Sequence, residues 1–128
     1  MVDVAIIDYN LGNLHSVYSA CKHVGLDAQI TNDSKVILNS RSSILPGVGA
    51  FGEAMQNIKN LDLNDTILEY VSSGRPFFGI CLGMQLLFDK SEEFGSNEGL
   101  GLIKGKAQKF NNMNTSENNY PVPQIGWN

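Results

Sequence analysis

The sequence is poor in residue types that define particular classes of protein. It has only two cysteines and two histidines among 128 residues. Two cysteines are too few for a disulfide framework, and two histidines leave little from which to build a zinc site. Cys21 and Cys81 are therefore expected to be free thiols, and we expect no metal or other cofactor.

Basic residues and long apolar runs are also scarce. Nine Lys and Arg against thirteen Asp and Glu give a net charge of −4, and the basic residues are scattered. Nucleic acids and anionic lipids are therefore poor candidate partners, because both need a cationic surface. No apolar run approaches the ~20 residues that a bilayer span needs, and the first ten residues lack the basic segment of a signal peptide. These absences predict a soluble, cytoplasmic protein.

The apolar residues that are present, 42% of the chain, are enough for one compact domain. An apolar run at 2–7 predicts a first strand, and 28–31 and 43–45 are further strand candidates. A helical pattern that begins at Leu14 and ends at Gly25 lies between the first two. Strands that alternate with helices through short links predict an α/β domain with a mostly parallel sheet flanked by helices.

The second half of the chain continues this alternation and then loses it. Helices are expected at 52–59 and 65–73. A strand is expected at 76–80, followed at once by a further helix at 81–88. Loop is expected from residue 89, apart from a strand within 104–110. Because no closing helix follows, we expect residues 1–128 to be the N-terminal part of a single larger domain, with an incomplete sheet.

Cys81 lies between a predicted strand and a predicted helix, in the pattern Gly79-x-Cys81-x-Gly83. This is the spacing of the nucleophile elbow of hydrolases, with cysteine in place of serine. Glycines two positions away accommodate the crowding of a sharp, strained turn. The helix start places partial positive charge near the sulfur, which favours the thiolate, and the backbone N–H of Leu82 could stabilise an oxyanion. The alternative is a small buried cysteine packed under a helix.

A second glycine-rich loop, PGVG at 46–49, follows the predicted strand at 43–45. Its glycines let the backbone approach a ligand or turn an N–H toward it, so the loop offers a second oxyanion donor. Both loops are expected at the carboxyl ends of parallel strands, where open α/β sheets bind ligands. The alternative is an ordinary turn after a strand.

A cysteine nucleophile needs a general base, usually histidine, and no histidine follows Cys81 in this chain. His15 and His23 belong to the first helical pattern and are expected at the surface, whereas Cys21 has the spacing of a core residue. Either the base lies in a later segment, or the chain is not a catalyst by itself.

Four segments, taken in order, resemble the class I glutamine amidotransferases: DYNLGNLHSV at 8–17, ILPGVGAFG at 44–52, GICLGMQLLF at 79–88 and PQIGWN at 123–128. Within that family the chain is most similar to the glutaminase subunits of imidazole glycerol phosphate synthase, from histidine biosynthesis. The resemblance covers the whole chain, and the combination of motifs is specific although each one is weak. It implies a flavodoxin-like fold and a longer chain, whose catalytic histidine and glutamate come after residue 128.

The resemblance implies a reaction for Cys81. The thiolate would attack the side-chain amide of glutamine, form a γ-glutamyl thioester and release ammonia, which a channel would carry to a cyclase or synthase subunit in a heterodimer. Val48 and Leu82 would supply the oxyanion N–H groups.

The resemblance also implies which residues bind glutamine. Gln85 and Glu93 would hold the substrate beside the backbone of Gly47 and Gly49. Judged without the resemblance, Gln85 is a solvated helix residue, and Glu93 is one member of an acidic loop pair with Glu92.

Two segments of the chain resemble parts of the family near the partner interface. They place Asn13, Trp127 and Asn128 at that interface, where an exposed aromatic residue is a suitable anchor. A tryptophan near a chain end could equally belong to the core.

Gln124 departs from the pattern, because the histidine-biosynthesis enzymes usually carry histidine there, and Asn10 stands in a turn that often has glycine. The departure at Gln124 leaves open a paralogous amidotransferase that supplies ammonia for the modification of surface-polysaccharide sugars. A second alternative is a non-catalytic α/β module that binds a partner or a small ligand.

Overall fold

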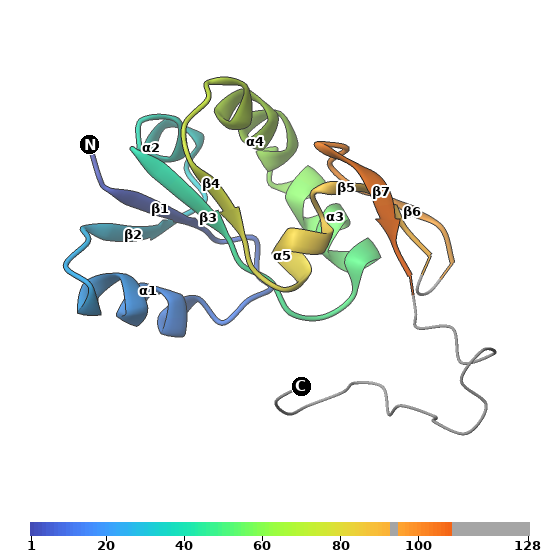
Figure 1. Ribbon diagram of the computed structural model, residues 1–128, viewed down its shortest axis with the longest axis horizontal. Coiled ribbons are helices and arrows are strands. Elements are labelled where there is room, and N and C mark those ends of the chain that lie inside the picture. The colour runs from blue at the N-terminus through green and yellow to red at the C-terminus, as the bar shows by residue number, and fades with distance from the viewer. Residues whose placement is uncertain (93–94, 109–128) are drawn as a thin grey trace.

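The computed structural model describes residues 1–92 and 95–108, which form two sheets (Figure 1). The larger sheet has the strand order β2-β1-β3-β4, and all its neighbouring strands are parallel. This confirms the predicted α/β class with a parallel sheet. The four strands are β1 (Val4–Ile7), β2 (Ala28–Thr31), β3 (Ser42–Leu45) and β4 (Phe77–Gly79).

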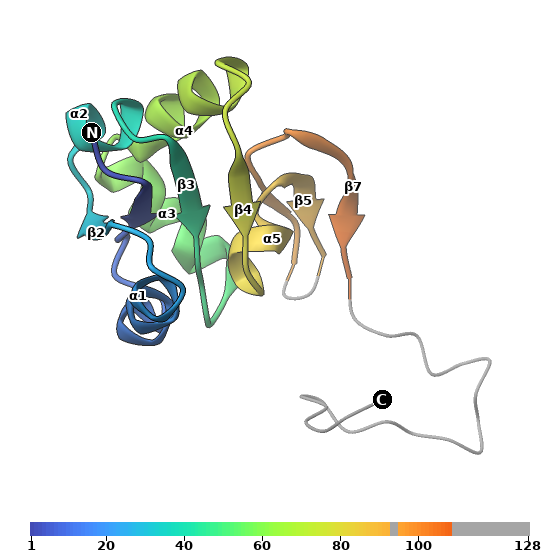
Figure 2. The ribbon, with the colours of Figure 1, turned by 60° about the vertical axis from the view of Figure 1, so that its left-hand side comes forward.

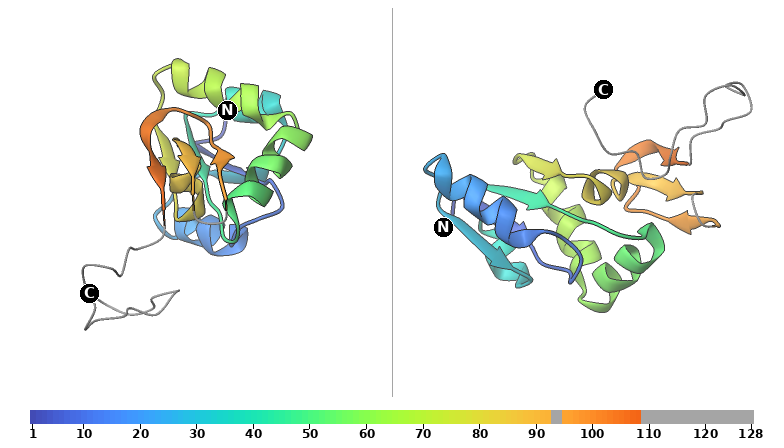
Figure 3. Two further views of the ribbon diagram at one scale, coloured as in Figure 1. Left: turned by 90° about the vertical axis from the view of Figure 1, so that its right-hand side faces the viewer. Right: turned by 90° about the horizontal axis from the view of Figure 1, so that it is seen from below.

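Helices cover both faces of the larger sheet (Figure 3). One face packs against α1 (Leu14–His23). The other packs against α2 (Ser34–Leu38), α3 (Phe51–Asn60) and α4 (Leu63–Ser72). Within the part of the chain that the structure describes, no helix is long and apolar enough to cross a bilayer.

The central strand β1 is apolar at every position because both of its faces are buried. Ala5 and Ile7 join the core formed with α2, α3 and α4, whereas Val4 and Ile6 pack against Cys21 of α1. The core position predicted for Cys21 is confirmed, and burial raises the pKa of its thiol.

The smaller sheet replaces a helix and loop that the sequence pattern predicted. Helix α5 (Leu82–Gln85) is a single turn, and Phe88 already belongs to β5 (Phe88–Ser91). The carbonyl oxygens of Leu86 and Leu87 accept hydrogen bonds from the N–H groups of Leu100 and Leu102, each at 2.8 Å. The predicted helix to residue 88 is therefore wrong: α5 ends at Gln85, and the backbone from Leu86 onward pairs with a later segment instead.

Two short strands complete the smaller sheet on either side of β5. Strand β6 (Asn97–Glu98) is antiparallel to it, and β7 (Ile103–Ala107) is parallel to it. The sequence predicted the strand at β7 and a loop at β6. This sheet lies at the opposite end of the molecule from β2 (Figure 1).

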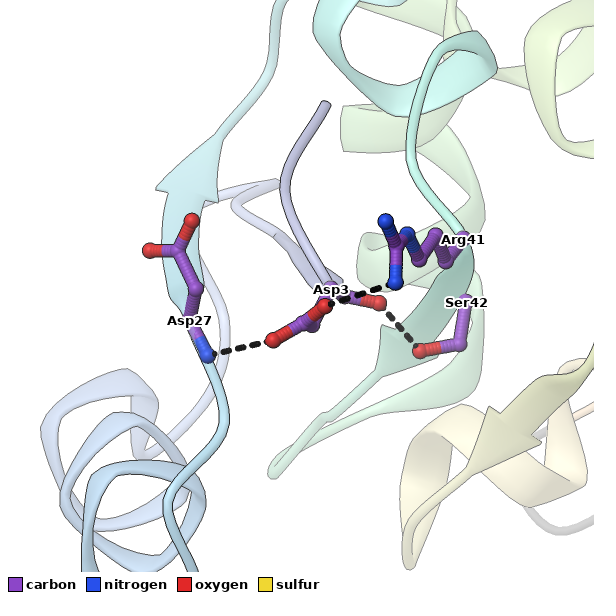
Figure 4. Close-up of polar contacts among 4 residues, drawn as sticks. All are labelled: Asp3, Asp27, Arg41 and Ser42. Carbon is purple, nitrogen blue, oxygen red and sulfur yellow. Dashed lines mark hydrogen bonds and ion pairs between the residues drawn. The ribbon is translucent and has the colours of Figure 1, made fainter.

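A polar cluster around Asp3 links the amino-terminal ends of β1, β2 and β3 in the larger sheet (Figure 4). The Asp3 carboxylate accepts a hydrogen bond from the Asp27 N–H at 2.9 Å and lies 3.7 Å from the Arg41 guanidinium. The Ser42 hydroxyl donates to the Asp3 carbonyl oxygen at 2.7 Å. These bonds favour the observed register of β1 between β2 and β3.

Asn10 lies in the β1–α1 loop with a φ of +71°, a region that side chains other than those of Asn and Asp rarely adopt. Its N–H donates to the Asp8 carboxylate at 3.0 Å, and this backbone donor is independent of the Asn10 side chain. We expect Asn10→Ala to lower the free energy of unfolding by about 1 kcal/mol. Asn10→Gly should cause no such loss. Urea denaturation of the three proteins checks this, and equal stabilities of the alanine and glycine variants would contradict it.

Candidate active site

Cys81 lies on a sharp turn between β4 and α5, with φ +53° and ψ −119°. Such a conformation is strained for a residue with a side chain, and it leaves the thiol exposed. A Cβ atom at Gly79 would lie 2.7 Å from the Cα of Met84, and one at Gly83 would overlap the Leu45 carbonyl oxygen. Both glycines of the G-x-C-x-G pattern therefore allow backbone segments to approach closely around Cys81.

The PGVG loop at 46–49 contacts this turn directly. Strands β3 and β4 are parallel neighbours, and both run toward α5 (Figure 2). Gly47 is buried where a Cβ atom would lie 3.0 Å from the Gly83 nitrogen and 3.1 Å from the Leu82 Cβ. Gly49 has a φ of +106°, and Val48 between the two glycines is 54% exposed. The structure thus brings together the two loops that the sequence analysis singled out.

The two N–H groups expected to bind an oxyanion do not face a common point in this structure. The Leu82 N–H donates a hydrogen bond of 3.3 Å to the Gly47 carbonyl oxygen. Because the C=O and N–H of a planar trans peptide point in opposite directions, the Val48 N–H points away from Leu82. Bringing both donors to one oxyanion requires that this hydrogen bond break, at a net cost of about 1 kcal/mol, and that the 47–48 peptide rotate.

Tyr9 makes a buried hydrogen bond to the PGVG loop. It was not identified from the sequence as a residue of the site. It follows β1 and is fully buried, and its hydroxyl donates to the Pro46 carbonyl oxygen at 2.6 Å. The Asn57 side-chain amide of α3 in turn donates to the Tyr9 carbonyl oxygen at 3.0 Å. A hydroxyl-bearing aromatic residue at the carboxyl end of a buried strand was the only signal available in the sequence.

The residues proposed to bind glutamine are described in part. Gln85 is half-buried, and its N–H donates to the Cys81 carbonyl oxygen at 3.1 Å, so it lies one helical turn after the cysteine. Glu93 lies outside the described residues. Its neighbour Glu92 is 3.1 Å from the Lys106 ammonium and 3.5 Å from that of Lys90. The hydrogen bond from Lys106, helped by Lys90, lowers the pKa of Glu92.

The residues expected at a partner interface are also described only in part. Asn13 is the exposed N-cap of α1, and its side-chain oxygen accepts from the Ser16 N–H at 3.4 Å. That hydrogen bond gives Asn13 a local structural role, whether or not a partner binds there. Gln124, Trp127 and Asn128 lie outside the described residues.

Both histidines of the chain lie on the first helix, α1, which packs against the face of the sheet formed with Cys21. His15 and His23 are both exposed, as predicted. Among residues 1–92 and 95–108, no group of three His, Cys, Asp or Glu side chains could hold a metal ion. What the two loops can provide is a nucleophilic thiol and nearby backbone donors.

Sequence comparisons with known proteins point to one family. The profile of the family described as glutamine amidotransferase class-I matches residues 5–122. A subunit of imidazole glycerol phosphate synthase, HisH, from Wolinella succinogenes is 48% identical over 98% of this chain. The corresponding HisH subunit from Sulfurimonas denitrificans is 49% identical over the same share. The chain spans 60% of the length of each of these relatives.

A solved structure supports the same fold at a much lower sequence identity. A crystal structure described as a glutamine amidotransferase superposes with a TM-score of 0.70 at 19% identity. The match covers 83% of this chain and 56% of the other. The profile match over most of the sequence, together with this common fold, shows that the chain belongs to the class I glutamine amidotransferase family.

Proposed function

We propose that this chain carries the nucleophile side of a glutaminase site that hydrolyses L-glutamine to glutamate and ammonia. The observation that carries the proposal is the strained Cys81 turn in contact with the Gly47 loop. A thiol held at a strand-to-helix turn beside a loop with backbone donors suits acyl transfer from an amide.

The proposed reaction has two stages. The Cys81 sulfur attacks the side-chain carbonyl carbon of glutamine, and the Leu82 and Val48 N–H groups stabilise the oxyanion that forms. Collapse of this intermediate breaks the C–N bond, and ammonia leaves with a proton from a general acid, giving a γ-glutamyl thioester. Water then hydrolyses the thioester to glutamate and restores the thiol.

Gln85 and Glu93 are proposed to hold glutamine beside the backbone of Gly47 and Gly49, and the Glu93 carboxylate suits the α-ammonium group of the substrate. The general acid and base are proposed to be a histidine outside this chain's sequence, since both of its own histidines lie on α1. Without that histidine the thiolate has no partner to protonate the departing ammonia.

The proposed acceptor of the ammonia is a cyclase or synthase subunit that makes imidazole glycerol phosphate, in a cytoplasmic heterodimer. Support comes from relatives named as subunits of imidazole glycerol phosphate synthase, at 48% and 49% identity. Asn13, Trp127 and Asn128 are the proposed contact residues. Gln124 favours the second candidate, a synthase that amidates polysaccharide sugars, and genes next to this one from either pathway would distinguish the two.

Covalent labelling tests for a glutamine pocket at Cys81. We expect diazo-oxo-norleucine, an electrophilic analogue of glutamine, to add once to the complete gene product, at Cys81, and glutamine to slow the addition. Cys21 provides an internal control in the same protein, because it is buried and its thiol has a raised pKa. Intact mass and peptide mapping measure both sites. Equal labelling of the two thiols, or no labelling, would favour the non-catalytic module instead.

A further inference from the structure

The hydroxyl of Tyr9 makes a hydrogen bond that joins two loops far apart in the sequence. It donates to the Pro46 carbonyl oxygen at 2.6 Å, across 37 residues, from a side chain with no exposed surface. Burial raises the pKa of Tyr9, so its hydroxyl keeps its proton and remains a donor at any pH at which the protein would work. A buried donor with one defined acceptor fixes the position of that acceptor closely.

The accepting carbonyl belongs to the peptide group immediately before the one that must rotate. The Pro46–Gly47 peptide carries the acceptor, and the next peptide carries the Gly47 carbonyl and the Val48 N–H. A side chain at Gly47 would overlap the Tyr9 hydroxyl, so the hydroxyl also occupies the space behind this rotating unit. At the far end Gly49, with a φ of +106°, has a backbone conformation that suits glycine.

The position of Tyr9 is itself held by a second element. The Asn57 amide of α3 donates to the Tyr9 carbonyl oxygen at 3.0 Å, and Asn57 is half-buried. A chain of two hydrogen bonds therefore runs from α3 through Tyr9 to the loop that lies against Leu82.

We propose that Tyr9 is a positioning residue for the oxyanion loop. Its hydroxyl holds the Pro46–Gly47 peptide still, so that rotation is confined to the 47–48 peptide and brings the Val48 N–H beside the Leu82 N–H. Tyr9 contacts neither glutamine nor the sulfur and acts only through the Pro46 carbonyl. This inference rests on the proposed glutaminase function.

The test is Tyr9→Phe in the complete gene product, assayed with its ammonia-accepting partner. Removing an oxyanion donor outright typically costs 10²–10³ in kcat, and this change only loosens one, so we expect a loss of about tenfold. The KM for glutamine should change less than about twofold, because the oxyanion exists only in the transition state and intermediate.

Tyr70→Phe is the matched control. Tyr70 is also fully buried, and its hydroxyl donates to the Ser40 carbonyl oxygen at 3.2 Å. This hydrogen bond joins α4 to the segment between α2 and β3, away from the PGVG loop. Both variants lose one buried hydroxyl and should lose similar thermal stability, but Tyr70→Phe should keep the wild-type kcat. A kcat for Tyr9→Phe equal to that of the control would overturn the inference.

A second variant decides the matter if Tyr9→Phe does not fold. Asn57→Ala removes the hydrogen bond to the Tyr9 backbone and should lower kcat several-fold, again without a matching change in KM. An unchanged kcat in this variant would overturn the inference. If the unmodified protein releases no glutamate with its partner present, it is the proposed function that fails.

Discussion

Replacing Cys81 by alanine is expected to abolish glutamine-dependent ammonia release, with a loss of roughly 10⁴-fold or more in kcat, as when the nucleophile of a covalent hydrolase is removed. The thiol is the atom that forms the acyl bond in the proposed reaction, and no other cysteine lies at the turn. Glutamate release by the complete gene product, measured with its partner, gives the result. Equal rates in the variant and the parent protein would remove Cys81 from the mechanism.

Two controls separate this effect from damage to the fold or to the partner. Cys21→Ala removes the other thiol, which packs against Val4, Ile6 and Ala28 on the opposite side of β1 from the main core, so it should cost some stability and leave kcat unchanged. Adding ammonium salt to Cys81→Ala should restore product formation by the partner, because free ammonia bypasses the glutaminase step. Failure of this rescue would mean that the variant no longer supports its partner.

Gly83→Ala is expected to lower the free energy of unfolding by about 3 kcal/mol, because the added Cβ would meet backbone that cannot move aside easily. That Cβ would overlap the Leu45 carbonyl oxygen, and it would lie 2.7 Å from the Leu45 carbonyl carbon and 3.1 Å from the Pro46 carbonyl carbon. Helix propensity alone gives the opposite sign, since alanine is preferred to glycine by about 1 kcal/mol in a helix. Urea denaturation therefore distinguishes close approach from propensity by the direction of the change.

Gly25→Ala is the control for this comparison. Gly25 has a φ of +84°, and a Cβ there would have no neighbour within 4 Å, so only backbone strain is added, at about 1 kcal/mol. If Gly83→Ala lowers the free energy of unfolding no more than Gly25→Ala does, the close contact between β3 and α5 can relax to accept a side chain.

The elements that the sequence predicted well are those whose signal is local. Strand β2 has the predicted bounds, and β1 and β3 differ only at their first residues. Strand β1 is a continuous apolar run, and β2 and β3 are short segments with apolar residues between polar turns, which is a local pattern typical of strands. The Cys81 turn was also predictable, because the glycines on either side of it lie where a Cβ atom would clash with neighbouring backbone. Helix α2, at Ser34–Leu38, was missed because five residues are too few to show a helical period.

What the sequence could not provide is the set of contacts between distant segments. At the α5–β5 boundary, the N–H groups of Leu100 and Leu102 bond to the carbonyl oxygens of Leu86 and Leu87, some 14 residues earlier in the sequence. The bond between Tyr9 and Pro46, like that between Leu82 and Gly47, joins residues more than 30 positions apart. No periodicity of either segment indicates which backbone group will meet which, so the state of the candidate oxyanion donors had to come from the structure.

The central place of β1 has a consequence for the chain during its synthesis. Its neighbours in the sheet, β2 and β3, both come later in the sequence, and β3 is complete only at Leu45. Until then the apolar segment Val4–Ile7 leaves the ribosome with at least one edge unpaired, which is the kind of segment that aggregates. Rapid pairing through the β1–α1–β2 unit would cover one edge early, so mutations that slow α1 formation should harm yield in the cell more than they harm the stability of the finished protein.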